Sequence, residues 1–75
     1  MNKLGNSTTH RVLDVALELA QQRYPQARGY QGLMKKIALD DFGIGLTQDR
    51  KGYWANGIIK DEKKYMIFAL TWGLK

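Results

Sequence analysis

The chain has 75 residues, and 12 Lys+Arg against 7 Asp+Glu give it a formal net charge of +5. A chain of this length forms one domain that buries only about 60% of its unfolded surface. It contains no cysteine and a single histidine, His10, which excludes disulfides, thiol chemistry and Cys/His zinc sites. We therefore expect a protein that is not an enzyme and has no cofactor, no metal and no small-molecule substrate. The excess of positive charge favours a polyanionic partner.

No segment has the length of a membrane span. The longest apolar stretch, Tyr65–Trp72, is much shorter than the roughly 18 residues that a transmembrane helix needs. The N-terminus has no hydrophobic signal core. These features predict a cytoplasmic protein without a membrane partner. Residues 1–6 show no periodicity and are expected to be a mobile arm of the single domain 1–75.

Two amphipathic helices are predicted in the first half of the chain. From Val12 to Ala20, apolar residues recur at i, i+3, i+4, i+7 and i+8, which indicates a helix over about 9–24 that Pro25 ends. Apolar residues with the same periodicity predict a second helix over about 31–42. The segment between them is interpreted as a break in the helical structure.

Two interpretations fit the next segment. In one, Thr47 or Leu46 begins a short third helix that ends at Asn56–Gly57, where glycine takes the left-handed position after a helix. In the other, Asn56–Gly57 is the two-residue turn of a β-hairpin, flanked by Tyr53–Ala55 and Ile58–Lys60. Both structures are consistent with the local composition.

The C-terminal segment also has two interpretations, of which we favour the helix. Its apolar residues from Met66 to Trp72 alternate as in a strand, but an uninterrupted apolar run also suits a buried helix. Asp61 precedes an acidic first turn, and Gly73–Leu74 resembles a Schellman-type helix ending. A helix that follows Lys60 or Asp61 and ends at Gly73 is therefore predicted.

The order of these elements resembles a helix-turn-helix domain of the lambda-repressor/Cro superfamily. The resemblance covers about residues 33–74 and is carried by Trp54-Ala55-Asn56-Gly57 and by the run IFALTWGL at Ile67–Leu74, which is similar to the phage CII activators. Gly45 and Gly57 also have the spacing that such proteins show between the turn glycine and the glycine of the terminal Asn-Gly. The resemblance implies an all-α fold, a small helix-turn-helix bundle of four to five helices. It further implies a phage or bacterial transcription regulator, an activator or a repressor, that binds duplex DNA.

The resemblance also implies a DNA-binding surface, in which residues around 47–53 begin a recognition helix in the major groove. Gln48 would bond to adenine, Arg50 to guanine or phosphate, and lysines before and after this helix to phosphates. Asp49 would accept from cytosine, while Lys51 and Tyr53 would lie near the backbone or the groove wall. The predicted set comprises Thr47, Gln48, Asp49, Arg50, Lys51, Tyr53, Lys35, Lys36, Lys60, Lys63 and Lys64.

A homodimer is expected, because one short recognition helix contacts too few base pairs for useful specificity. The first helix, with its wide apolar surface, is the predicted interface. The alternative is an α+β fold, two helices packed on a C-terminal β-hairpin or meander formed by residues 44–74. Such a chain would serve as a small protein-binding inhibitor or accessory module without DNA binding.

Overall fold

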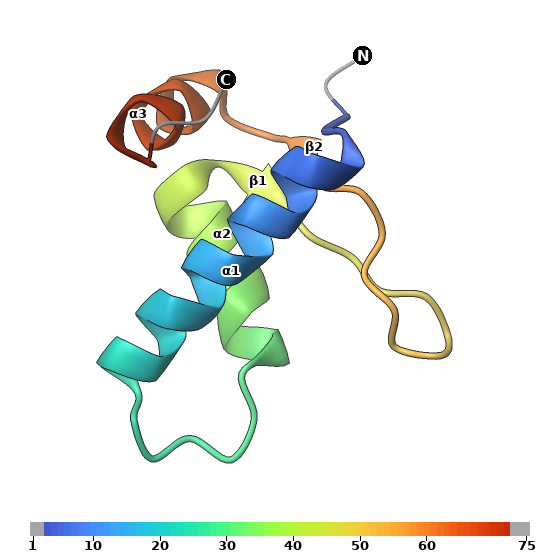
Figure 1. The fold of residues 1–75 in the computed structure, drawn as a ribbon, viewed down its shortest axis with the longest axis vertical. Helices are drawn as coiled ribbons and strands as arrows, with labels where there is room; N and C mark the ends of the chain where they lie inside the picture. The colour runs from blue at the N-terminus through green and yellow to red at the C-terminus, as the bar shows by residue number, and fades with distance from the viewer. Residues whose placement is uncertain (1–2, 73–75) are drawn as a thin grey trace.

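The computed structural model describes residues 3–72, which form three helices and one two-stranded antiparallel sheet (Figure 1). In chain order the elements are α1 (Asn6–Arg23), α2 (Gln31–Phe42), β1 (Ile44–Gly45), β2 (Ile58–Ile59) and α3 (Glu62–Trp72). The fold is thus α+β. The expected all-α bundle of four to five helices is wrong, and the α+β alternative describes the chain.

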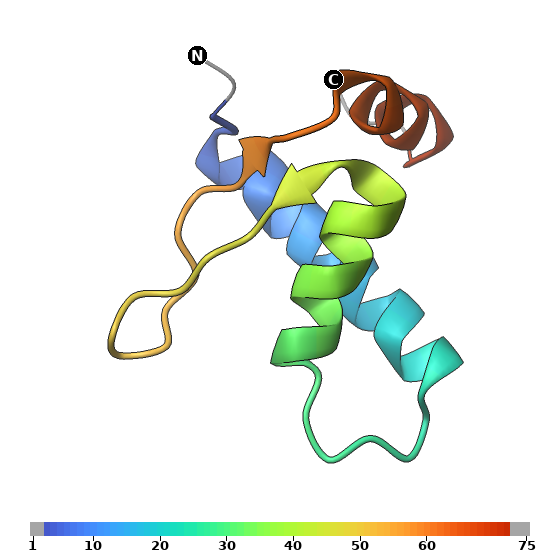
Figure 2. The ribbon, with the colours of Figure 1, turned by 180° about the vertical axis from the view of Figure 1, so that it is seen from behind.

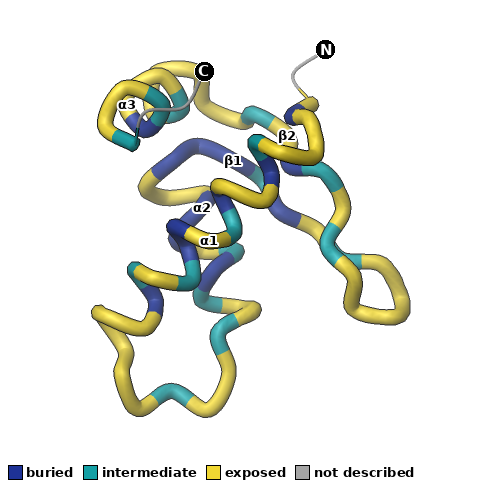
Figure 3. Tube along the Cα trace, in the orientation of Figure 1, coloured by how far each residue is buried: buried dark blue, intermediate teal, exposed yellow. Residues whose placement is uncertain are grey.

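The two N-terminal helices form a helical hairpin and supply most of the core. Both predicted helices are confirmed, although α1 begins three residues earlier than expected. Figure 3 shows that the buried positions lie where the two helices face each other. The buried side chains of the helical hairpin are Thr9, Val12, Val15, Ala16, Ala20, Met34, Ile37, Ala38 and Phe42.

The segment after α2 is a β-hairpin, so the predicted third helix over 47–56 does not form. Ile44 pairs with Ile59 beside α2, and Gln48 pairs with Trp54 farther out. Ile44 and Leu46 are buried while Gly45 between them is only half-buried, which is the alternation of a strand with one face on the core. Burial of these two side chains against the helices stabilises the extended conformation over the predicted helix. Figure 2 shows the hairpin projecting from the helices.

The Asn-Gly pair is neither a helix end nor the hairpin turn. The side-chain amide of Asn56 donates to the carbonyl of Leu4 at 2.9 Å, and the N–H of Leu4 donates to the carbonyl of Gly57 at 2.8 Å. Lys3 forms a bridge with Ile58, and Leu4 belongs to the core. Residues 3–5, expected to be part of a mobile arm, therefore lie along the second arm of the hairpin.

A buried hydroxyl joins α1 to this arm of the hairpin and gives a testable prediction. The N–H of Gly57 donates to Thr9 Oγ1 at 3.1 Å in a buried environment. In Thr9→Val the shape is kept but the buried N–H loses its acceptor. We expect the free energy of unfolding to fall by about 1–3 kcal/mol, measured by urea denaturation.

Thr8→Val is the matched control, because Thr8 is only half-buried and makes no side-chain hydrogen bond within residues 3–72. It should leave the urea midpoint nearly unchanged. Equal losses in the two variants would show that the Thr9 hydrogen bond does not stabilise the fold.

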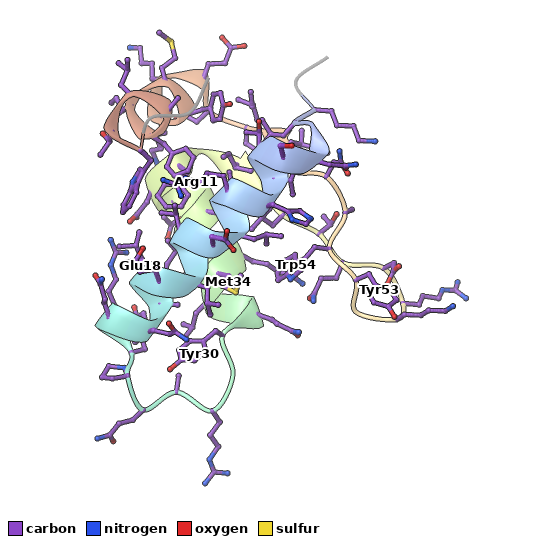
Figure 4. The ribbon with its side chains drawn as sticks, viewed as in Figure 1. Arg11, Glu18, Tyr30, Met34, Tyr53 and Trp54 are labelled. Atoms are coloured by element: carbon purple, nitrogen blue, oxygen red, sulfur yellow. The ribbon has the colours of Figure 1, made fainter. Side chains whose placement is uncertain are left out.

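Helix α3 lies across the C-terminal end of α2. It confirms the helix predicted for the C-terminal segment. The ring centroids of Phe42 and Phe68 are 4.1 Å apart. Arg11 of α1, labelled in Figure 4, donates from Nη2 to the carbonyl of Trp72 at 3.4 Å. The predicted ending at Gly73–Leu74 lies outside the described residues. Over residues 3–72, none of the helices has the length and apolar character needed to cross a membrane.

Candidate nucleic-acid interface

The tip of the hairpin is a three-residue loop of Arg50, Lys51 and Gly52. The N–H of Gly52 donates to the carbonyl of Asp49 at 3.0 Å, and the N–H of Asp49 donates to the carbonyl of Tyr53 at 2.9 Å. Gly52 has φ +89°, a conformation that glycine adopts without strain. A hydrogen-bonded four-residue turn that ends in a glycine with positive φ suits a three-residue hairpin loop.

Two polar side chains stabilise this loop by hydrogen bonds to its backbone. Asp49 Oδ1 accepts from the N–H groups of Lys51 and Tyr53, both at 2.9 Å, and Gln48 Nε2 donates to the carbonyl of Gly52 at 2.9 Å. Their hydrogen bonds are therefore made within the turn. The predicted contacts of Gln48 with adenine and of Asp49 with cytosine assumed a recognition helix, which does not form, and both side chains hydrogen-bond within the turn instead.

The exposed residues at the tip include two basic side chains and one aromatic side chain, together with Asp49. Arg50 and Lys51 are exposed, and Tyr53 is 70% exposed. Figure 4 labels Tyr53 on the projecting hairpin, where it also lines a pocket with residues of α1. Thr47 is also exposed, and its carbonyl accepts from the N–H of Ala55 at 3.0 Å. The loop thus presents two cations and a phenol on a hydrogen-bonded frame.

Trp54 connects the hairpin to the helices. It packs against the core, and the Nζ of Lys35 lies 5.7 Å from the centroid of its ring, within cation–π distance. Between the hairpin and α1 is a shallow pocket of about 330 Å³, lined by His10, Leu13, Asp14, Tyr53 and Trp54. The pocket combines aromatic surface with a carboxylate and an imidazole, and no sequence pattern connects these residues.

The other predicted basic residues do not form one surface with the tip. Lys36 is exposed on α2, and Lys60 is exposed just after β2. Lys63 and Lys64 are exposed on α3, which Figures 1 and 2 show on the side of the molecule away from the hairpin loop. The fold thus separates the predicted basic residues into a tip group, Arg50 and Lys51, a pair on α2, Lys35 and Lys36, and a group of lysines on and before α3.

One local signal in the sequence corresponds to the observed turn. Aspartate at the first position and glycine at the fourth are favoured in type I turns, and Asp49 and Gly52 have this spacing. The stronger hairpin signal of Asn56–Gly57 concealed it. The proximity of His10 and Asp14 to Tyr53 has no local signal, because these residues are about forty positions apart.

Neither a metal site nor a known relative identifies the function. Across residues 3–72, no three His, Asp or Glu residues are grouped so that they could hold a metal ion. Comparisons with family models, curated proteins and solved structures find no significant match. Only the residues of this chain and their arrangement therefore indicate a function.

Proposed function

We propose that this chain binds duplex DNA through the tip of its β-hairpin. The observation that supports the proposal is the exposure of Arg50, Lys51 and Tyr53 on a loop that Gln48 and Asp49 hold in one conformation. A two-stranded β-ribbon fits the major groove of B-DNA, so a recognition helix is not required. A preformed loop also loses less conformational entropy on binding than a flexible one.

Each exposed side chain at the tip has a role in this proposal. Arg50 has the planar donor set that bonds bidentately to guanine or to phosphate. Lys51 contributes a phosphate contact, and the hydroxyl of Tyr53 can donate to phosphate or sugar oxygens. Lys35 and Lys36 on α2 add positive charge behind the loop. The proposed role is that of a small transcription regulator, acting as a pair of chains on two half-sites and without cofactor or chemistry.

The proposal predicts two distinct effects of substitutions at the tip. Arg50→Ala is expected to weaken DNA binding by about 1–3 kcal/mol, the cost of removing a side chain that reads a base. Lys51→Ala is expected to weaken binding equally for all DNA sequences. It should also reduce the slope of log K against the logarithm of the salt concentration by about one. Fluorescence anisotropy with labelled duplexes at several salt concentrations measures both effects.

Arg28→Ala is the matched control, because Arg28 is also exposed but lies in the loop between α1 and α2. It changes the net charge by the same amount and should affect affinity much less than Arg50→Ala. Equal losses would show that net charge, and not the tip, determines binding. Absence of binding by the folded protein even at low salt would contradict DNA binding and favour the protein-binding module.

A further inference from the structure

Helix α3 has two apolar faces, and the fold covers only one of them. The inner face consists of Tyr65, Phe68 and Trp72, which pack against the core. The outer side chains are among the most exposed apolar ones in the described part of the chain: Met66 is 62% exposed, Ile67 65% and Leu70 83%. An α-helix with a second apolar face in solvent is a recognised sign of an interaction surface.

Together with Lys63, these three residues form a continuous stripe along the helix. Positions 63, 66, 67 and 70 have the spacing i, i+3, i+4 and i+7, and a stripe with this spacing spans about 100° of the helix surface. The inner residues lie on the opposite side of the same helix. We call Lys63, Met66, Ile67 and Leu70 the outer stripe.

We propose that the outer stripe binds the same stripe of a second copy of this chain, with the two α3 helices antiparallel. A two-fold axis through the middle of the stripe brings Met66 of one copy opposite Ile67 of the other, and Lys63 opposite Leu70. The stripe is thus self-complementary under the symmetry that most homodimers have. The methylene groups of Lys63 would cover Leu70 of the second copy while the ammonium group stays in water.

Charge favours the antiparallel orientation over the parallel one. Lys60, Lys63 and Lys64 all lie at or before the N-terminal turn of α3. Asp61 and Glu62 lie in the same segment, so residues 60–64 carry a net charge of 3 − 2 = +1 on each copy, and parallel helices would bring two such positive ends together. Antiparallel helices separate them and place Lys63 near the C-terminal end of the other helix, where the helix dipole favours a cation.

The apolar area is sufficient for a dimer of ordinary size. The exposed fractions of Met66, Ile67 and Leu70 correspond to about 400 Å² of apolar surface on each copy, and dimer interfaces are about 60% apolar. The whole interface would therefore bury about 1,300 Å² from both copies, at the lower end of the range for stable complexes. We expect a dimer that dissociates on dilution.

Sedimentation equilibrium over a wide range of protein concentrations tests the proposal, which does not depend on DNA binding. The mass should rise from 8.6 kDa to twice that value as concentration increases. Ile67→Glu and Leu70→Glu should remain monomeric throughout, with an unchanged helical circular dichroism spectrum. A wild-type protein that is monomeric at every concentration would contradict the proposal.

The control for these variants is Tyr24→Glu, a charge introduced at another exposed apolar residue. Tyr24 is 45% exposed and lines the competing apolar surface, a shallow pocket of about 550 Å³ with Pro25 and Leu33. Tyr24→Glu should still dimerise. If it becomes monomeric while Ile67→Glu does not, the pocket and not the outer stripe is the interface.

Cross-linking tests the orientation, since the chain has no cysteine of its own. A mixture of Lys63→Cys and Leu70→Cys proteins should form a mixed disulfide under mild oxidation. Each variant alone should cross-link poorly, because antiparallel helices hold like positions apart. Efficient cross-linking of Lys63→Cys with itself would overturn the antiparallel arrangement.

Discussion

Phe68→Ala is expected to lower the free energy of unfolding by about 3–5 kcal/mol, the usual cost of removing a buried phenylalanine. Phe68 is 2% exposed and is the only buried residue in the described helix α3. Its ring lies 4.1 Å from that of Phe42 and 6.4 Å from that of Tyr65, measured between centroids. The expected loss is a large part of the roughly 4–11 kcal/mol available to a domain of this size.

Urea denaturation followed by circular dichroism measures this loss, and hydrogen exchange shows where it occurs. We expect the amides of α3 to lose protection before those of α1 and α2. Thr71→Ala is the control on the same helix, because Thr71 is exposed, lies outside the outer stripe, and alanine is a good helix former. Similar destabilisation by both substitutions would show that Phe68 does not hold α3 on the core.

Gly43→Ala is expected to have the second large effect. It should lower the free energy of unfolding by about 3 kcal/mol or more, because it adds both backbone strain and a steric collision. Gly43 ends α2 with φ +67°, a conformation that strains any residue with a Cβ atom. A Cβ atom here would also collide with the backbone carbonyl of Asp61, just before α3. The carbonyl of Gly43 accepts from the N–H groups of Lys60 and Asp61, so the collision would disturb the hydrogen bonds that fix the start of α3.

Gly32→Ala is the matched control, since Gly32 lies within α2 and nothing surrounds the position of its missing Cβ atom. It should stabilise the protein by about 0.5–1 kcal/mol, because alanine is the better helix former. Thermal or urea unfolding of both variants gives the comparison. A Gly43→Ala protein as stable as the wild type would mean that the junction between α2 and α3 adapts without cost.

The two proposed surfaces are compatible with each other. The hairpin tip and α3 lie on different sides of the chain (Figures 1 and 2). Two chains joined through the outer stripe would therefore keep both tips free and separated, as binding to two half-sites requires. The first helix, predicted to be the dimer interface, has its apolar residues buried or half-buried against the core instead.

The amphipathic helices could be predicted from sequence because their signals are local. The periodicity of α1 and α2, the stop at Pro25 and the end signals of α3 all lie within a few residues of the elements that they define. The positive charge and the absence of cysteine are likewise properties of composition. Arg50, Lys51 and Tyr53 were identified as candidate contacts, although for a helix and not for a hairpin loop.

The sequence by itself determined the two N-terminal helices, favoured a helix over a strand in the C-terminal segment, and excluded thiol chemistry. Only the tertiary structure decided the conformation of 43–60, because the side chains of Ile44 and Leu46 gain most from burial in an extended segment packed on the helices. Tertiary packing also decided which face of α3 is covered. Both faces are apolar in the sequence, and contact with Phe42 covers the side of Phe68 and leaves Leu70 in solvent.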